Sequence, residues 1–418
     1  MTHDDTPVTD DADRRCPVIH LNRHSPQYRL DFQELADEFH ERCPMAWNDT
    51  HGGYWFASGN KQLFDIARRA DLLSNDNDVA GVRRGYLGIN IPPIADEYRT
   101  RGGFIEMDPP DQRYYRQALN PYLSPAAVAR WKPVIEELTR ACLDEVIETG
   151  RIDFVDDLAN IVPAVFTLAM LGLPLKDWDV YCEPVHAAVY TPMDSPEYAR
   201  IAQLQLRMVE RLMEGVNEIR STPRPGLINE LVNLELDGRC PDDREIIGVL
   251  ALLIGGGFDT TTALTAHSLE WLGEHPDQRE RLSRERKTLL DSATEEFLRY
   301  FTPAQGDGRT VSQDCELNGT KFKEGDRLWL SWAMANRDAE VWERPDEFDV
   351  TRSFENAHQS FGHGEHSCPG ALLARTDSAI IIERLLARFP TWEPAGPALR
   401  WASPFLQGMT TLPLRFGV

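Results

Sequence analysis

The stretch FGHGEHSCPGALLAR, Phe361–Arg375, decides how the rest of the chain is interpreted. It places one thiol, that of Cys368, in a glycine-rich loop that leads into an apolar helical pattern. Glycines let a loop backbone adopt conformations closed to other residues and let a flat partner approach, and the loop has Gly362, Gly364 and Gly370. A cysteine at a helix start is close to free amide hydrogens and to the positive end of the helix dipole, and both favour thiolate. The stretch therefore predicts a cysteine that presents its sulfur to a metal.

Two simpler interpretations of Cys368 need to be weighed. A lone cysteine is commonly a small buried hydrophobe, and composition alone favours that role. The neighbouring His363 and His366 also suggest a zinc site. Structural zinc sites, however, use four ligands, commonly in paired spacings, and the sequence has no CxxC pair. The order of residues around the cysteine is more specific than either interpretation.

Four residues of the stretch, Phe361, Gly364, Cys368 and Gly370, form the pattern FxxGxxxCxG. The loop resembles the haem-binding signature of cytochromes P450, and of their soluble bacterial members in particular. The resemblance implies that the Cys368 thiolate is the proximal ligand of a haem b iron, an arrangement that favours O–O cleavage. It also implies a mainly α fold, the helical triangular prism of the family, with small β-sheets near residues 309–331 and near the C-terminus.

Length, charge and cysteine content limit the function further. The chain has 418 residues and a formal net charge of −23, which argues against nucleic acid and against an anionic membrane surface as partners. Its seven scattered cysteines argue against a disulfide framework and favour a reducing cytoplasm. We expect no signal peptide, no membrane anchor and no apolar stretch of about 18 residues. We also expect residues 1–15 to form a disordered tail and residues 16–418 to form one cytochrome P450 domain.

A second motif lies in the longest helical pattern, which runs from Asp242 to about Leu272. Asp242 and Glu245 have the spacing of a capping box, and the residues that follow are apolar nearly all round, which predicts burial. The sequence GGGFDTTT at residues 255–262 then interrupts the pattern, and each glycine costs roughly 1 kcal/mol relative to alanine in a helix. Such a segment indicates a kink, a close helix crossing or room for a ligand.

The same segment resembles the oxygen-activation motif (A/G)Gx(D/E)T of cytochromes P450. On this resemblance Gly256 lies against the haem, Asp259 relays protons from solvent and Thr260 holds a water beside bound dioxygen. We expect the Thr260 hydroxyl to bond the carbonyl four residues back and to open the helix locally. The acid–alcohol pair favours O2 with external electrons over peroxide as the oxidant.

Residues far apart in the sequence are implied to hold the haem propionates. The segment MDPPDQRYYR, residues 107–116, matches the family pattern DPP(E/D)(H/Q)xxxR. The resemblance places four polar side chains on the propionates: Gln112, Arg116, Arg309 and His366. Asp307 would lie near the same carboxylate, so we expect a raised pKa or a close arginine partner for it.

Two further features surround the cysteine loop. Glu296 and Arg299 match the family's ExxR, a buried structural ion pair that serves folding and haem retention. Its usual third partner is not evident in Pro345–Phe348. Pro369 has no N–H to donate to the sulfur, so we hypothesise a lower iron potential than in Pro369→Leu, which measured potentials would test.

The rest of the chain gives a coarser prediction. Periodicity predicts helices over Asp31–Cys43 and Asn60–Ala70, a strand over Tyr54–Ala57 and successive amphipathic helices over residues 126–236. By resemblance the irregular segment Ser74–Arg101 walls a substrate pocket, although an ordinary surface loop is an alternative.

The roof of that pocket is predicted from a second irregular pattern. The stretch Val185–Met193 is interpreted as the break between two helices that cover the pocket, with His186 a satisfied surface or pocket histidine rather than a ligand. The candidate pocket residues are Ile89, Ile91, Val189, Leu252 and Phe405.

These motifs together predict a cytochrome P450 monooxygenase. It would insert one oxygen atom from O2 into an apolar small molecule, such as a terpenoid, steroid, fatty acid or aromatic compound. The chain has no GxGxxG motif, so electrons from NAD(P)H are expected through a separate ferredoxin and reductase. Arg113 and Arg375 are either contacts for such an acidic carrier or solvated surface. The alternatives are a non-oxygenating haem enzyme and a haem-based sensor or ligand carrier, and the acid–alcohol pair argues against both.

Overall fold

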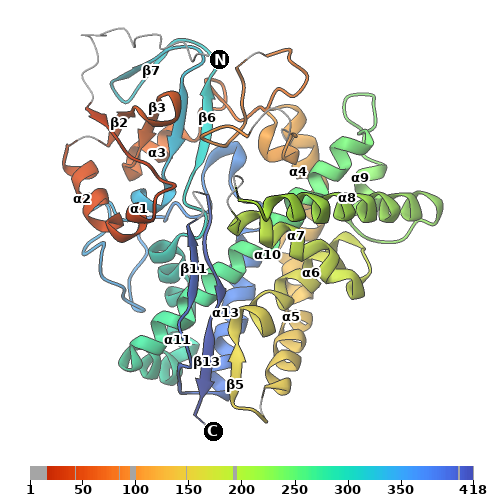
Figure 1. Cartoon of the computed structure of the whole chain (residues 1–418), viewed down its shortest axis with the longest axis vertical. Helices are drawn as coiled ribbons and strands as arrows, with labels where there is room; N and C mark the ends of the chain where they lie inside the picture. The colour runs from red at the N-terminus through yellow and green to blue at the C-terminus, as the bar shows by residue number, and fades with distance from the viewer. Residues whose placement is uncertain are drawn as a thin grey trace.

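The computed structural model describes residues 17–42, 44–83, 85–94, 100–146, 148–191, 195–402 and 405–417. The predicted tail at residues 1–15 lies outside the described residues. The described chain forms a mainly α structure with small sheets, as predicted, and Figure 1 shows the largest sheet at the upper left of a helical body.

The longest helix of the described chain, α10 (Asp243–Glu274), crosses the middle of the molecule (Figure 1). The predicted capping box fixes its start, because Glu245 N donates to Asp242 Oδ1 and Asp242 N donates to Glu245 Oε2, both at 2.9 Å. Such a box satisfies two amides that have no partner within the helix. The helix then packs against α6, α7, α11 and α13, so it is the scaffold on which the predicted Asp259 and Thr260 are carried.

Among the described residues, α10 is also the one helix long and apolar enough to span a membrane. The expectation that no stretch reaches such an apolar length was therefore wrong. Burial explains the composition, because more than half of its most apolar window lies inside the protein. A helix that is apolar nearly all round here serves as the core of a globular fold.

The other α-helices surround α10 or lie beside the largest sheet. Their bounds are α1 (Pro26–Leu30), α2 (Phe32–Arg42), α3 (Asn60–Ile66), α4 (Asp111–Leu123), α5 (Pro125–Glu145), α6 (Ile161–Leu171), α7 (Trp178–Tyr190), α8 (Tyr198–Ser221), α9 (Leu227–Val232), α11 (Pro276–Phe301), α12 (Trp332–Ala335) and α13 (Ala371–Arg388). Short 3-10 or π turns are η1 (Thr50–Gly52), η3 (Gly103–Glu106), η4 (Val155–Ala159), η5 (Leu175–Asp177) and η6 (Gly364–His366). The last of these lies in the cysteine loop, directly before α13.

The largest sheet has the strand order β1-β2-β3-β9-β6-β4. Its strands are β1 (Val18–Ile19), β2 (Met45–Asn48), β3 (Tyr54–Ala57), β4 (Leu73–Ser74), β6 (Asp307–Val311) and β9 (Arg327–Leu330). Strand β3 runs parallel to β9, with Trp55 opposite Leu328, and β9 pairs antiparallel with β6, with Leu328 opposite Arg309. The sheet therefore joins the N-terminal region to the strand that carries Arg309.

The remaining strands form small sheets in the predicted regions, except β5, which lies outside both regions and joins a C-terminal sheet. One sheet has the order β10-β13-β5 and two are hairpins, β11-β12 and β7-β8. The bounds are β5 (Arg151–Asp153), β7 (Cys315–Leu317), β8 (Thr320–Phe322), β10 (Trp392–Pro394), β11 (Leu399–Ala402), β12 (Gln407–Thr411) and β13 (Pro413–Phe416).

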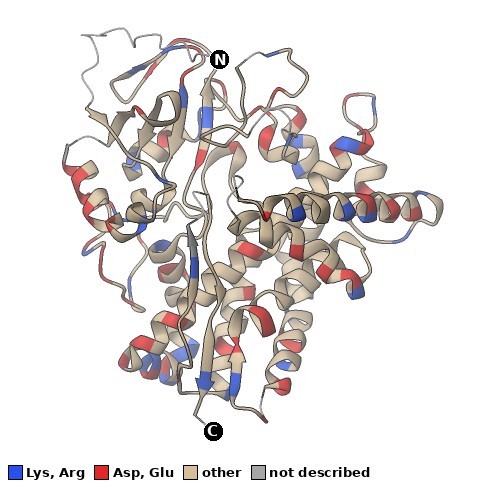
Figure 2. Ribbon diagram, in the orientation of Figure 1, with Lys and Arg blue, Asp and Glu red and all other residues tan. Residues whose placement is uncertain are grey.

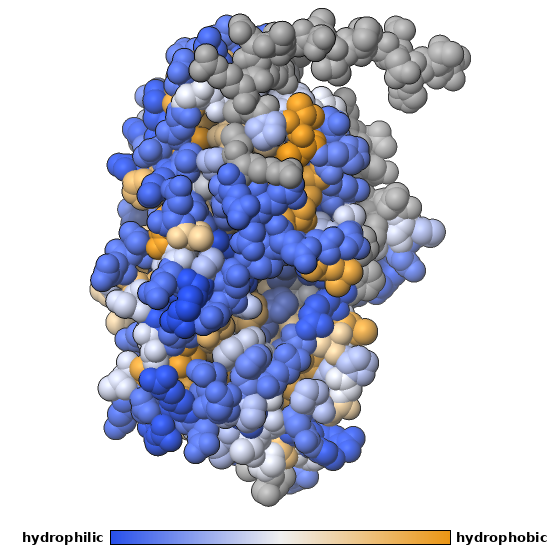
Figure 3. Space-filling view, turned by 90° about the vertical axis from the view of Figure 1, so that its left-hand side faces the viewer, coloured by the Kyte–Doolittle hydropathy of each residue, from blue (hydrophilic) through white to orange (hydrophobic). Residues whose placement is uncertain are grey.

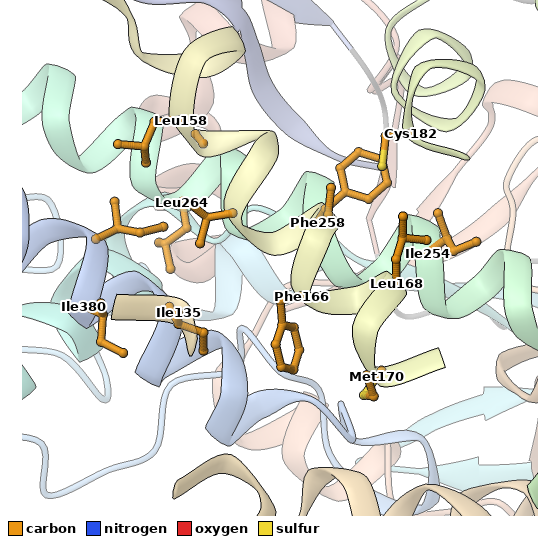
Figure 4. Packing of buried hydrophobic residues seen from close by; sticks show 14 of the residues in the cluster. Ile135, Leu158, Phe166, Leu168, Met170, Cys182, Ile254, Phe258, Leu264 and Ile380 are labelled. Carbon is orange, nitrogen blue, oxygen red and sulfur yellow. The ribbon is translucent and has the colours of Figure 1, made fainter. Parts of the chain in front are cut away.

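The main hydrophobic core lies between α10 and the helices that cover it. Figure 4 shows Leu168 of α6 beside Ile254 of α10, and Phe166 and Phe258 belong to the same cluster; all four are nearly fully buried. Burying one such side chain contributes about 1.5–3 kcal/mol relative to leaving it exposed. This packing fixes α10 along the same turns that carry its glycines and its acid–alcohol pair.

Several predicted boundaries are confirmed and two are corrected. Strand β3 has the predicted bounds and α2 follows the prediction closely, but α3 ends at Ile66 rather than Ala70 because the chain turns into β4. The predicted break at Val185–Met193 is wrong over its first part, since α7 continues to Tyr190. Residues 192–194 lie outside the described residues, and α8 begins at Tyr198.

Charged side chains cover the surface with both signs interspersed. Figure 2 shows Lys and Arg next to Asp and Glu on most elements in view, and Figure 3 shows a mainly hydrophilic face with small apolar patches. The net charge of −23 is thus spread over the molecule rather than carried by one segment.

Candidate active site

The loop before α13 holds Cys368 in a backbone turn. Cys368 N donates to Phe361 O at 2.8 Å, which closes the loop on itself. Gly362 and Gly364 have φ of 62° and 74°, so both need glycine. Gly370 differs from the prediction, because it has an ordinary φ of −88° as the residue before α13. A side chain at Gly370 would lie 3.9 Å from Cys368 Sγ, an ordinary contact.

The thiol of Cys368 lies deep in the molecule, yet its side chain is accessible. Burial raises the pKa of Cys368, while the Gly370 amide and the charges of Arg116 and Arg375 lower it. Without a bound metal, Cys368 therefore does not show the expected preference for the thiolate over the thiol. Stabilising the anion at this position requires a positive partner for the sulfur, which a metal ion supplies.

The three consecutive glycines of α10 have three different surroundings. A Cβ built on Gly255 would lie 3.2 Å from Val185 Cγ1 of α7, and one on Gly257 would lie 2.7 Å from Thr167 Oγ1 of α6. A Cβ on Gly256 would meet no neighbouring atom within 4 Å. The outer glycines therefore permit close helix crossings, and the middle one is exposed and borders open space. Of the three alternatives that the sequence left open, the close helix crossing and the open space occur, at different glycines.

The acid and the alcohol of α10 point to different neighbours. Thr260 Oγ1 donates to Gly256 O at 3.0 Å, as predicted, so the alcohol lies beside the same open space. Asp259 is fully buried and its Oδ1 lies 2.8 Å from His186 Nδ1 of α7. Burial raises the pKa of Asp259, and the hydrogen bond from His186 lowers it in part. Asp259 Oδ2 has no hydrogen-bond partner among the described residues.

Basic side chains from three elements meet near the cysteine loop. Burial, together with the charges of Arg309 on β6 and Arg116 on α4, lowers the pKa of His366 to about 3, so both guanidiniums lie within range of one imidazole. Arg116 is half-buried and makes no hydrogen bond or ion pair with the described residues. Arg309 Nη1 lies 2.8 Å from Asp307 Oδ1. Burial raises the pKa of Asp307, so both outcomes expected for this carboxyl occur.

Gln112 and Arg113 attach α4 to the cysteine loop. Gln112 Nε2 donates to Glu365 O at 2.6 Å, and its buried Oε1 has no partner among the described residues. Arg113 pairs with the Glu365 carboxylate at 2.7 Å. Arg375, the other predicted carrier contact, pairs with Glu295 at 2.5 Å and lies over the Phe361 ring. Both arginines are therefore engaged within the protein.

The Glu296–Arg299 pair is buried and has a third partner that the sequence did not reveal. Arg299 donates to both carboxylate oxygens of Glu296, at 2.7 and 2.8 Å. Arg352 Nε also donates to both, at 3.0 Å, and its other nitrogens bond the carbonyls of Glu343, Arg344 and Glu347. Arg352 lies four residues after the Pro345–Phe348 segment. Its position shortly after Phe348 is the only signal in the sequence that could have identified it.

The family model of the cytochromes P450 matches residues 91–399, which contain the cysteine loop, the acid–alcohol pair and the Glu296–Arg299 network. The chain belongs to the cytochrome P450 family. It is an oxidoreductase of the monooxygenase class, as predicted, and the family implies a haem iron cofactor.

Known cytochromes P450 align with nearly the whole chain. Linalool 8-monooxygenase of Pseudomonas putida is 29% identical over 386 residues, 88% of this chain and 91% of the relative. Steroid C26-monooxygenase of Mycolicibacterium smegmatis is 27% identical over 399 residues, 91% of this chain and 89% of the relative. The crystal structure of CYP109E1 from Bacillus megaterium in complex with testosterone is similar with a TM-score of 0.81 at 27% identity, over 94% of this chain and 100% of that one.

The described residues of this cytochrome P450 fit a haem. Cys368 offers an accessible sulfur, and Gly256 leaves space on the facing helix. Arg116 without a protein partner, Arg309 and a neutral His366 supply donors of the kind that bind carboxylates. Among the described residues no cluster of three or more His, Cys, Asp or Glu side chains is placed to hold a metal ion, so the zinc interpretation has no support.

The predicted pocket residues lie on several elements. Val189 and Phe405 pack around Tyr190 and Ala263, where α7, α10 and the C-terminal hairpin meet. Ile91 belongs to the core beneath the largest sheet, so its side chain packs on protein rather than facing a pocket. Ile89 is buried in the irregular loop, and Leu252 lies on α10 one turn before Gly256.

His186 is the residue near the site whose contact was missed. The sequence indicated a satisfied histidine and gave no partner, since Asp259 lies 73 residues away. Only the packing of α7 on α10 brings the two side chains together.

Proposed function

We propose that this cytochrome P450 is a haem b enzyme that inserts one oxygen atom from O2 into an apolar small molecule of terpenoid or steroid size. Cys368 holds the iron through its sulfur, in the loop shaped by Gly362 and Gly364. Haem supplies, when bound, the reductive activation of dioxygen. The other steps below belong to the side chains of this chain.

Polar side chains orient the cofactor at its carboxylate edge. Arg116, Arg309 and His366 bind the propionates, and Arg309 also holds Asp307 so that this acid does not repel them. Gln112 contributes to haem binding indirectly, because its Nε2 donates to Glu365 O and so holds the cysteine loop. Gly256 and Gly370 let the ring approach α10 and the start of α13, and Phe361 shields the sulfur side.

Thr260 and Asp259 carry the proton chemistry. The Thr260 hydroxyl donates to Gly256 O, which leaves its lone pairs free to accept a hydrogen bond from a water in the open space. Asp259 supplies the protons, because burial raises the pKa of its carboxyl and so favours the protonated form more than in a free aspartic acid. This pair beside an open stretch of α10 is the observation that carries the proposal.

The substrate and the electron source are inferred from relatives and from composition. Ile89, Val189, Leu252 and Phe405 give the pocket an apolar wall, and the names of similar proteins include a linalool and a steroid monooxygenase. We assign electron supply to NAD(P)H through a separate ferredoxin and reductase, with the enzyme in the cytoplasm. We also propose that residues 16–418 form one domain preceded by a disordered tail.

The test is oxygen-isotope incorporation. The holoenzyme is supplied with NADH, a surrogate ferredoxin and its reductase under ¹⁸O₂, with linalool, testosterone and palmitate as probes. We expect NADH-dependent hydroxylated product that carries ¹⁸O from linalool or testosterone. Haem binding without NADH-dependent product from any probe would instead support a carrier or sensor, and product from palmitate alone would overturn the proposed substrate class.

A further inference from the structure

Among the described residues, His186 of α7 links the buried Asp259 to the exposed surface. The carboxyl is fully buried, whereas the His186 side chain, 2.8 Å away, keeps 21% of its surface exposed. His186 Nδ1 faces Asp259 Oδ1, so the second ring nitrogen is directed away from the carboxyl. An imidazole with one nitrogen on a buried acid and one toward water is suited to pass protons between them.

The surrounding packing holds this histidine in place. Val185, the residue before it, lies 3.2 Å from a Cβ built on Gly255, so α7 and α10 approach closely one turn before Asp259. The Tyr190 ring lies edge-on to the imidazole with 4.6 Å between centroids. Tyr190 itself is buried against Gly408, where a side chain would clash with its hydroxyl. The imidazole is thus confined on two sides and open toward water.

We propose that His186 is the residue through which solvent protons enter the active site, by way of Asp259. Nε2 takes a proton from hydronium as Nδ1 gives its proton to the Asp259 carboxylate, so the ring carries no net charge afterwards. The proton arrives on Oδ1, and rotation of the carboxyl then turns this protonated oxygen toward the water on Thr260, into the position of Oδ2, the oxygen without a partner among the described residues. His186 regains its Nδ1–H tautomer for the next transfer by turning its ring and exchanging its proton with water. This inference rests on the proposed function, in which Asp259 supplies protons to the site.

Other titratable groups, on η4 and α7, lie close enough to His186 and Asp259 for their charges to interact. The charge of His186 lowers the pKa of Asp156 on η4. The charge of Asp259 raises the pKa values of Cys182 and Tyr190 on α7. Burial raises the pKa of Cys182 to about 12 and raises that of Tyr190 as well, so both stay neutral at physiological pH. Burial also raises the pKa of Asp156, while His186 lowers it. The proton path therefore consists of His186 and Asp259. Of Asp156, Cys182 and Tyr190, only Asp156 can carry a charge at physiological pH and so alter proton transfer along this path.

The direct test measures proton exchange at Asp259 in the haem-loaded protein. Infrared difference spectra against Asp259→Asn assign the carboxyl band, and rapid mixing with D₂O follows its conversion to the deuterated form. We expect exchange at least about tenfold slower in His186→Asn, which can still donate a hydrogen bond to Asp259 but cannot transfer a proton. His186→Ala is expected to behave alike, and Glu183→Gln, an exposed change on the same helix, to match wild type.

The outcomes separate this inference from the proposed function. If Asp259 exchanges its proton as fast in His186→Asn as in wild type, His186 does not transfer the proton. If exchange is slow in His186→Ala but not in His186→Asn, the role of His186 is structural, and the inference is likewise overturned. The carbon-monoxide spectrum of each reduced variant shows independently whether the haem–thiolate centre is intact. In turnover with ¹⁸O₂, we expect His186→Asn to divert NADH electrons from product to hydrogen peroxide.

Discussion

At the residue scale, several candidate site residues of this cytochrome P450 are polar groups with incomplete partners. Arg116, Asp259 Oδ2 and Gln112 Oε1 lack hydrogen bonds among the described residues, and each borders the proposed site. Buried polar groups normally find partners, so such gaps mark places where a cofactor, a water or a proton belongs. Asp377 on α13 is another buried polar group with an unpaired atom, Oδ1, away from the cysteine loop.

Asp377 gives a prediction about stability and pH. Burial raises the pKa of this carboxyl from 3.8 to about 7, so its contribution to stability is present below pH 3.8 and is lost as the pH rises through about 7. Asp377→Asn cannot ionise, and we expect it to be more stable than wild type at pH 8, by up to about 4 kcal/mol, but not at pH 4. Thermal unfolding at both pH values measures this.

The control for that series is Glu316→Gln, which removes an exposed acid from β7. We expect its stability relative to wild type to be the same at both pH values. A difference between Asp377→Asn and wild type that did not change with pH would show that Asp377 stays ionised in the folded protein.

At the element scale, α10 packs tightly against α7 and α6 at Gly255 and Gly257 but borders open space at Gly256. Sequence alone predicted the helix, its capping box and its motif residues, because these depend on local chemistry and on spacing. It could not assign the glycines, because which one faces α6, α7 or the open space depends on how the helices cross. The same holds for His186 and Arg352, whose partners lie 73 and 56 residues away.

The glycine pair gives a matched prediction. Gly257→Ala places a methyl group 2.7 Å from the Thr167 hydroxyl, which is itself bound to Pro163 O, so we expect a loss of about 1–2 kcal/mol. Gly256→Ala meets no neighbour and gains helix propensity, so we expect unchanged or slightly higher stability of the haem-free protein. Thermal unfolding compares them, and Gly257→Ala with Thr167→Ala should recover the loss. Equal effects of the two single variants would contradict the assigned surroundings.

The buried network of α11 gives a further prediction. Arg352→Ala leaves Glu296 with one arginine and removes the donor to the carbonyls of Glu343 and Arg344, while Glu347 O keeps Arg299, so we expect a loss of about 3–5 kcal/mol and faster release of haem. Urea unfolding and haem transfer to an acceptor protein measure the two effects. Arg344→Ala, which removes an exposed ion pair with Glu347, should change stability by less than about 1 kcal/mol. Similar losses in both variants would refute the special role of Arg352.

At the scale of the whole molecule, the fold brings together side chains that the sequence separates widely. Helix α4 supplies Arg116, strand β6 supplies Arg309 and the loop before α13 supplies His366 and Cys368. Sequence motifs predicted the fold class and these residues because family signatures are local. They did not predict where α7 ends, because Tyr190 in its last turn packs against Ala263 of α10, a contact between residues far apart in the sequence.

The central claim is that the Cys368 sulfur binds the haem iron in this assembled site. The most direct measurement is the carbon-monoxide difference spectrum of the reduced protein, compared with those of Cys368→Ala and of Cys240→Ala, which alters another exposed cysteine. We predict the red-shifted Soret band typical of cytochromes P450 in the wild type and in Cys240→Ala, and its loss in Cys368→Ala. Persistence of that band in Cys368→Ala would contradict the account.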